Sequence, residues 1–351
     1  MNPVLTALIA ISVFGFLIFI HEFGHFITAR IFNVTINEFS IGMGPRILSR
    51  TSKKTGIKYS LAALPIGGFV AMAGESDESD DPNSFDKKPA WQRFIITAAG
   101  AFVNIVAGFL VTAILTMMIP IGNTTVSGFF DLAEQGYEVG DVTTEGVLQI
   151  GDEIIRVDGK RVRIYDELNY EIMRRAYEPI DLTVKRGGEV ITLENVVFPT
   201  VVEDGVGFGL RDFTVEPVEK HLGNVITFSW SKATLIVRMC WESLVDLITG
   251  RYSLSAVSGP VGVSTAIGDA AKAGFEPFLY MFALISINLG VMNLLPIPAL
   301  DGGRLLSTLV EMITRKKLPA KIENMINGIG LVLLLGLSLV IMLKDIFQLI
   351  F

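Results

Sequence analysis

An uncharged apolar run near the start of the chain is the feature that most constrains its fold. Residues 3–20 carry no charged side chain, and they lead directly into HEFGH at residues 21–25. The run is long enough to cross a bilayer as a helix. Because a charge at the bilayer centre costs roughly 2.5–3.5 kcal/mol on insertion scales, two imidazoles and a carboxylate on such a helix indicate a functional site.

The spacing within HEFGH predicts a metal site. His21 and His25 are one helical turn apart, so both imidazoles project from one face and can bind one Zn²⁺, with Glu22 beside them as general base. A chance match, or histidines held only by packing, is the competing explanation. Two of the chain's three histidines fall in this motif inside an apolar segment, and this favours the metal site.

The composition indicates a membrane protein and excludes several function classes. Half of the residues are hydrophobic, 19% are charged and the mean hydropathy is +0.52, which is typical of a multi-span protein with polar insertions. The net charge of −7 and the lack of a basic stripe argue against a nucleic-acid binder. The single cysteine, Cys240, excludes an intrachain disulfide and a cysteine-rich zinc site, so zinc would need histidine and carboxylate ligands.

The pattern of apolar and basic segments predicts a topology. The candidate spans are about 4–27, 94–119, 276–296 and 326–343. Lysines and arginines gather in loops 28–93 and 301–325, which the positive-inside rule places in the cytoplasm. Both termini and the region 120–275 then lie outside. Because the first run lacks a positive n-region and a convincing cleavage site, we interpret it as a retained span rather than a cleaved signal peptide.

Loop 28–93 contains two glycine-rich pieces, at residues 42–45 and 65–73. The apolar strip 59–73 is too short to span a bilayer and has β-like character around its glycines. We expect a hairpin that dips into the bilayer beside the metal, where protein or a wet cavity satisfies its backbone. An ordinary surface hairpin is the alternative.

The polar region predicts a small α/β domain followed by an amphipathic segment. A strand at 154–157, the Asp158-Gly159 turn, a helix at 165–176 and a hairpin over 180–197 follow in an order that resembles a PDZ domain. Whether such a domain binds peptides or only excludes large partners is open. Residues 217–248 carry Trp230 and Trp241 among aliphatic and charged residues, which favours a position at the membrane interface over a fifth span.

A third metal ligand is expected at the end of the third span, because catalytic zinc normally takes three protein ligands. The segment NLLPIPALDGG runs from Asn293 to Gly303, and its two prolines break the helix just before Asp301. Asp301 could instead cap a helix over 304–313. The predicted topology brings His25 and Asp301 to the same side of the membrane, which favours the ligand.

Taken together, HEFGH, NLLPIPALDGG and the PDZ-like insertion between the second and third spans resemble the site-2 protease family of intramembrane zinc metalloproteases, peptidase family M50. The likeness is greatest to the bacterial regulator of sigma-E protease and its sigma-W counterpart. It implies one Zn²⁺ per chain held by His21, His25 and Asp301, with Glu22 as catalytic base. It also implies that Asn293 holds the substrate backbone or the oxyanion. The substrate-binding strand would contain Gly67, Gly68 and Phe69.

The expected fold is a polytopic α-helical membrane protein with about four transmembrane helices, a membrane-associated β-hairpin and one inserted PDZ-like α/β domain. Its regions would be 1–120 with the HExxH span, 121–210 as the extracytoplasmic domain, 211–275 at the interface, and 276–351 with the last two spans. By resemblance, the protein lies in the bacterial inner membrane with its active site near the cytoplasmic face. Its partners are then the lipid bilayer and single-span substrates such as anti-sigma factors and remnant signal peptides.

Two other functions are compatible with parts of this pattern. A non-enzymatic PDZ scaffold in the membrane would not need intact His21, Glu22, His25 and Asp301. A metal transporter would need further carboxylates along a path through the membrane, and the apolar spans carry few. An intramembrane protease should cleave a transmembrane peptide and should be inhibited by a chelator. Neither a scaffold nor a transporter would show this activity.

Overall fold

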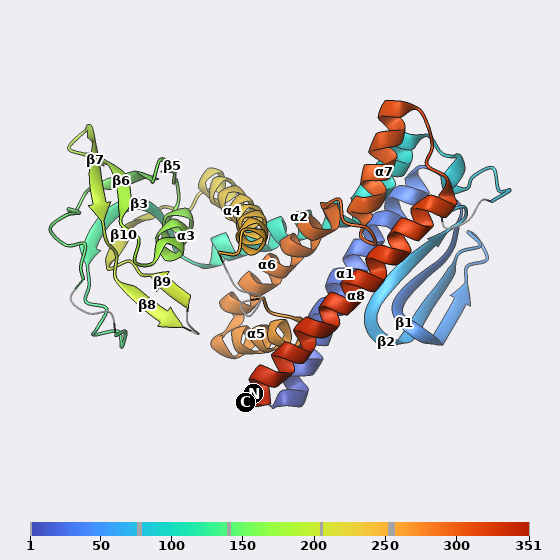
Figure 1. Ribbon diagram of the computed structural model, residues 1–351, viewed down its shortest axis with the longest axis horizontal. Coiled ribbons are helices and arrows are strands. Elements are labelled where there is room, and N and C mark those ends of the chain that lie inside the picture. The colour runs from blue at the N-terminus through green and yellow to red at the C-terminus, as the bar shows by residue number, and fades with distance from the viewer. Residues whose placement is uncertain (1, 76–78, 139–141, 204–205, 252–256, 351) are drawn as a thin grey trace. The chain divides into compact units, whose positions relative to one another are not determined.

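The computed structural model describes residues 2–75, 79–138, 142–203, 206–251 and 257–350 (Figure 1). Parts of the regions 121–210 and 211–275 that the sequence delimits therefore lie outside the described residues. The chain divides into two compact units, one formed by residues 1–111 and 236–351 and the other by residues 112–235. Each unit has its own core.

Among the described residues, four helices are long and apolar enough to cross a membrane. They are α1 (Pro3–Ile31), α2 (Ala90–Met118), α6 (Phe275–Leu294) and α8 (Ala320–Ile350). They coincide with the four spans expected from the sequence, although each helix except α6 extends beyond its apolar run. Helix α4 (Leu222–Ile248) occupies the amphipathic stretch and is not one of the four, so a fifth span is not supported.

In the first unit, two apolar clusters organise the packing around α1. The amino-terminal half of α1 packs through Leu17 and its neighbours against α6 and against α5 (Pro260–Ala273), a helix that the sequence analysis did not anticipate. The carboxy-terminal half packs through Phe26 against Phe39, Val70 and Ile96, which belong to the β-strands and to α2. This unit also contains the short η1 (Phe85–Lys87), α7 (Asp301–Thr314) and the carboxy-terminal part of α4.

Strands β1 (Ile36–Thr51) and β2 (Lys58–Met72) form a sheet that folds back on itself. Phe39 pairs with Val70 on one side and with Tyr59 on the other, so one length of β1 lies between two lengths of β2. Glycines at positive φ, Gly42, Gly44 and Gly67, lie where the strands reverse, a conformation that glycine adopts at little cost. The glycine-rich pieces thus create the bends of this sheet.

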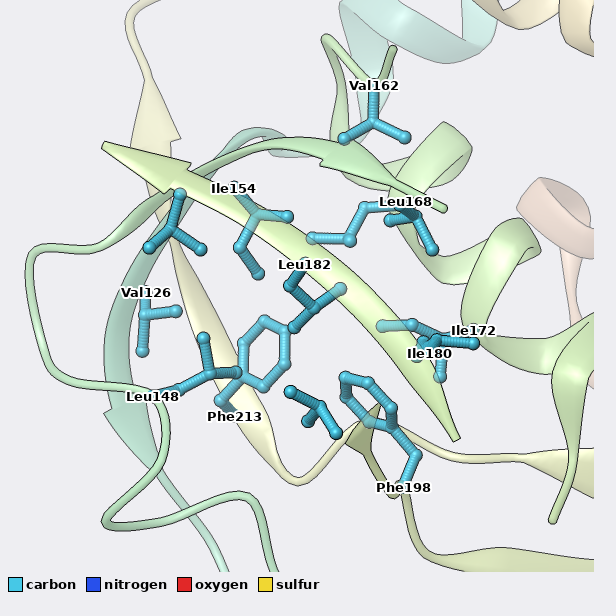
Figure 2. Packing of buried hydrophobic residues seen from close by; sticks show 13 residues of the cluster. Val126, Leu148, Ile154, Val162, Leu168, Ile172, Ile180, Leu182, Phe198 and Phe213 are labelled. Atoms are coloured by element: carbon cyan, nitrogen blue, oxygen red, sulfur yellow. The ribbon is translucent and has the colours of Figure 1, made fainter. Parts of the chain in front are cut away.

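The second unit contains a six-stranded sheet of order β10-β3-β4-β6-β7, with β5 paired to β4, and a separate β8-β9 hairpin. The strands are β3 (Ile121–Phe129), β4 (Glu153–Val157), β5 (Lys160–Arg161), β6 (Ile180–Arg186), β7 (Glu189–Val196), β8 (Thr200–Glu203), β9 (Val206–Gly209) and β10 (Phe213–Val218). Helix α3 (Tyr165–Arg175) joins β5 to β6. Figure 2 shows Leu168 and Ile172 of α3 meeting Leu182 and Phe213 of the sheet in one buried core.

The order of strand, turn, helix and hairpin in this unit agrees with the elements expected from the sequence. Asp158 and Gly159 form the turn between β4 and β5, both at positive φ. Asp152, which precedes β4, is fully buried and accepts two hydrogen bonds of 2.7 Å from the guanidinium of Arg186 on β6. This pair fixes the start of β4 against its neighbour. The likeness to a PDZ domain stays a prediction.

Candidate metal centre

Three donor atoms from distant parts of the first unit meet at one point. The Nε2 atoms of His21 and His25 lie 3.3 Å apart, and Oδ2 of Asp301 lies 3.0 Å from the first and 3.3 Å from the second. Both imidazoles are buried, and 22% of the Asp301 side chain is exposed. Two side chains come from α1 and the third from the first residue of α7.

This triangle fits a zinc ion. Two ligands at about 2.0–2.1 Å from a tetrahedral ion are about 3.3 Å apart, which matches the observed separations. Oδ2 of Asp301 has no hydrogen-bond partner of acceptable geometry among the described residues, although it is buried. A buried carboxylate oxygen that faces two imidazole nitrogens without an aligned hydrogen bond is suited to share a divalent cation with them.

The electrostatics of the triangle favour an ionised carboxylate. Burial of Asp301 opposes its ionisation, but the imidazoles of His21 and His25 beside it outweigh that effect and hold its pKa below the usual range. The carboxylate is therefore ionised at neutral pH and available as a ligand. In a metal complex both imidazoles would be neutral, and two histidines with one carboxylate form a donor set of a kind found in catalytic zinc sites.

Helix α2 supports the two histidines from behind. Nδ1 of His25 lies 2.8 Å from the backbone oxygen of Ile96, which can only accept, so Nδ1 carries the proton and Nε2 presents its lone pair. Nδ1 of His21 lies 3.3 Å from the side-chain amide of Asn104. Gly100 lies midway between Ile96 and Asn104 along α2. A Cβ at this residue would lie 2.4 Å from Nε2 of His25. Only glycine allows α2 to approach this closely.

The break between α6 and α7 positions Asp301. Helix α6 ends at Leu294, and α7 begins at Asp301 itself, with Leu300 as the capping residue and no side-chain capping bond. The interpretation of Asp301 as a helix cap is therefore wrong, and its carboxylate is free to face the histidines. A Cβ on Gly302 would lie 1.8 Å from the backbone oxygen of Leu295, so the loop closes tightly on the start of α7.

Polar contacts to three other elements hold α7. Arg93 on α2 forms an ion pair with Glu311, and Arg304 forms one with Glu75, which follows β2. The hydroxyl of Ser307 donates to a carboxylate oxygen of Glu323 on α8 at 2.8 Å. Arg304 lies one turn after Asp301, so the contact with Glu75 lies close to this candidate ligand.

A cavity of about 180 Å³ opens on the triangle. It is lined by the three ligand candidates and by Glu22, Phe69, Val70, Met72, Glu75, Thr97 and Arg304. Glu22 therefore shares the space in front of the donor atoms, as a general base requires. A Cβ on Gly68 would lie 3.2 Å from Cγ of Glu22, so β2 passes directly beside this carboxylate.

The structure gathers some of the predicted site residues and not others. His21, Glu22, His25, Asp301 and Phe69 line the cavity, and Gly68 adjoins it. Gly67 instead packs against the side chain of Met43, and the amide of Asn293 donates to the backbone oxygen of Leu289 at 3.0 Å. Asn293 is not among the lining residues.

Sequence reasoning missed the support from α2. Ile96 contributes a backbone oxygen, which has no sequence signature. The contact made by Asn104 could have been predicted, because a carboxamide in the middle of an apolar span is costly and needs a partner.

Comparisons with known proteins agree with this geometry. A family model described as "Peptidase family M50" matches residues 9–337. A protein of Clostridium perfringens named "Putative zinc metalloprotease" is 36% identical over 339 residues, which cover 96% of this chain and 97% of the relative. One of Fusobacterium nucleatum with the same type of name is 33% identical, with 98% and 99% covered. The zinc metalloprotease RasP of Geobacillus kaustophilus is 29% identical, with 96% of each covered.

Proposed function

The chain belongs to peptidase family M50 and is a zinc metalloprotease, and from this premise we propose that it cleaves peptide bonds within the membrane-spanning segments of single-span proteins. One observation carries the proposal: the triangle of His21, His25 and Asp301 lies beside Glu22 and between helices apolar enough to span a bilayer. A hydrolytic site built into such helices is suited to a substrate that is itself in the membrane.

His21, His25 and Asp301 would hold the zinc ion. When bound, zinc acts as a Lewis acid that acidifies water and polarises a carbonyl group. Glu22 takes a proton from the attacking water at its carboxylate and later gives it to the leaving amine.

The edge of β2 is proposed to hold the substrate in an extended form. Residues 68–72 pair with residues 36–41 on one side, and no other described strand pairs with their free side. A transmembrane helix satisfies its own carbonyl groups, so it must unwind locally before hydrolysis. Adding the unwound segment as a strand beside Gly68 and Phe69 would replace the lost hydrogen bonds and place it next to Glu22.

The orientation in the membrane follows from the basic loops. Loops 28–93 and 301–325 carry most of the positive charge that flanks the spans, so we place them, and with them the metal centre, toward the cytoplasmic face of a bacterial inner membrane. The region 121–210 would then lie outside the cytoplasm as a PDZ-like domain that excludes substrates with large outer domains. The proposed substrates of the protease are remnant signal peptides and anti-sigma factors whose extracytoplasmic part has already been removed.

The test uses the full-length protein purified in detergent, with a labelled transmembrane peptide and zinc analysis. Wild type is expected to bind zinc and to cleave the peptide, and a chelator should stop cleavage. Glu22→Gln should keep zinc and lose activity, whereas Asp301→Ala should lose both. Glu276→Gln, in the first turn of α6 and outside the cavity lining, is the matched control and should behave as wild type. Cleavage by Glu22→Gln at the wild-type rate would contradict the mechanism.

A further inference from the structure

Asn104 is a buried amide that the catalytic mechanism does not use. It lies in the middle of α2, its side chain is completely buried, and its Nδ2 atom is 3.3 Å from Nδ1 of His21. Its Oδ1 atom is buried as well and has no hydrogen-bond partner among the described residues. Among the described residues, the amide therefore has one polar contact, to the ring nitrogen of the proposed metal ligand His21. Its oxygen can still accept a hydrogen bond.

The position of Asn104 repeats the arrangement found at His25. Ile96, Gly100 and Asn104 follow one another at intervals of four residues, so they lie along one face of α2. Ile96 accepts from Nδ1 of His25 at one end of this face, Gly100 lets both rings approach, and Asn104 meets Nδ1 of His21 at the other end. Each proposed histidine ligand thus has one α2 group behind it, on the nitrogen that faces away from the triangle.

The chemistry of imidazole determines what Asn104 must do there. A neutral ring carries one proton, so His21 can offer the Nε2 lone pair only when Nδ1 bears the proton and donates it. An Nδ2–H group that donates to Nδ1 would select the opposite tautomer and place a proton on Nε2, inside the triangle. A half-turn of the amide exchanges Oδ1 and Nδ2, which are nearly equal in size, and gives Nδ1 its acceptor.

We propose that Asn104 is a positioning residue that accepts a hydrogen bond from Nδ1 of His21 through Oδ1, and so fixes the tautomer and the ring orientation in which His21 binds the metal. The inference rests on the proposed metal site. Such partners of ligating histidines usually matter, and their loss costs about 10–100-fold in metal affinity.

The packing of α2 holds Asn104 in place for this role. The hydroxyl of Ser286 on α6 donates to the backbone oxygen of Asn104 at 2.8 Å, and both residues are completely buried. A Cβ on Gly290, one turn further along α6, would lie 2.7 Å from the backbone oxygen of Ala101. These contacts hold the backbone of Asn104 against α6.

Asn104 could instead serve only to join the helices, and matched variants separate the two roles. Asn104→Leu keeps the size of the side chain and removes the acceptor. Asn104→Asp keeps an acceptor and has no N–H to donate, and Asn104→Thr keeps a hydroxyl acceptor if the carboxylate prevents folding. Ser286→Ala removes a buried hydrogen bond between the same two helices without touching His21.

The readouts are zinc affinity by competition with a chelator and the visible absorption spectrum of the Co²⁺-substituted protein, measured beside thermal unfolding. Asn104→Leu should weaken zinc binding by about 10–100-fold and alter the Co²⁺ spectrum. Asn104→Asp, or Asn104→Thr in its place, should stay much closer to wild type than Asn104→Leu, and Ser286→Ala should retain wild-type zinc affinity.

Two results would overturn the assignment. Equal zinc affinity in wild type and Asn104→Leu would show that His21 does not depend on Asn104. A loss in Ser286→Ala as large as that in Asn104→Leu would show that helix packing alone is responsible. If wild type itself binds no zinc, the proposed function fails, and this result is distinct from either of the other two.

Discussion

Replacing Gly100 by alanine should damage the metal centre without changing a ligand. The added Cβ would lie 2.4 Å from Nε2 and 2.8 Å from Cε1 of His25, and 2.9 Å from Cε1 of His21. The ring of His25 cannot simply move aside, because its Nδ1 is bonded to the backbone oxygen of Ile96 at 2.8 Å. Either the ring gives up that bond or α2 moves away from α1.

The size of the effect follows from these distances. Ordinary contacts begin at 3.4 Å, so the nearest atoms must separate by 1.0 Å, the difference between 3.4 and 2.4 Å. Metal–ligand distances tolerate only about ±0.2 Å. Overpacking of this kind costs about 1–3 kcal/mol, and 1.4 kcal/mol corresponds to about a factor of ten in affinity. We therefore expect Gly100→Ala to weaken zinc binding by about 5- to 150-fold.

Gly108→Ala is the matched control, since Gly108 lies on the same helix and its Cβ would also meet an atom at 2.4 Å, Cγ1 of Ile287. That contact lies away from the histidines. Zinc affinity by chelator competition and thermal unfolding are measured for both variants. Gly108→Ala should lose stability and keep its zinc affinity. The reasoning is refuted if Gly100→Ala binds zinc as tightly as Gly108→Ala does.

Three further predictions concern contacts around the centre. Reversing either charge of the Glu75–Arg304 pair should reduce peptide cleavage, and the double exchange should recover part of it; additive losses would show that the pair is not coupled. Hydrogen bonds from Arg46 and Ser60 lower the pKa of Glu38 to about 2 despite burial, so its stabilisation is complete above the ordinary value of 4.5 and is lost as the pH falls toward 2. Thermal unfolding of Glu38→Gln should show less of this acid dependence than wild type. Asp345→Ala removes the acceptor of two backbone N–H groups at the start of α5, both at 2.9 Å, and should cost about 0.5–2 kcal/mol; hydrogen exchange that is unchanged in α5 would contradict this.

The membrane-spanning part of the fold could be predicted from the sequence because bilayer thickness sets the length of an apolar run. Helix α8 nevertheless extends beyond its predicted stretch of 326–343, since a helix continues into polar residues where hydropathy ends. Helix α5 was missed because its glycines, alanines and hydroxyl residues give no apolar period. Helix α5 is held by the packing of Ile267 against α1 and by backbone N–H groups that donate to the carboxylate of Asp345. Both partners lie outside the sequence of α5.

The site was predictable where one helix carries the whole pattern. His21 and His25 are ligand candidates from spacing alone, and Asp301 followed from topology. The two-sided pairing of β1 could not be predicted, since positive φ at single glycines reverses the strands there. The role of Asn104 depends on which face of α2 packs against α1. The sequence of each helix alone does not determine that face.

The supports of the three donor atoms differ, and this difference determines how the centre can respond to the rest of the protein. The histidines rest on α2 across a glycine contact that leaves no room for movement. Asp301 depends on α7, which is tied through Arg304 to the residue Glu75 that follows β2 and through Ser307 to α8. Loss of the Glu75–Arg304 or Ser307–Glu323 contact should therefore alter the position of Asp301 while both imidazoles stay in place.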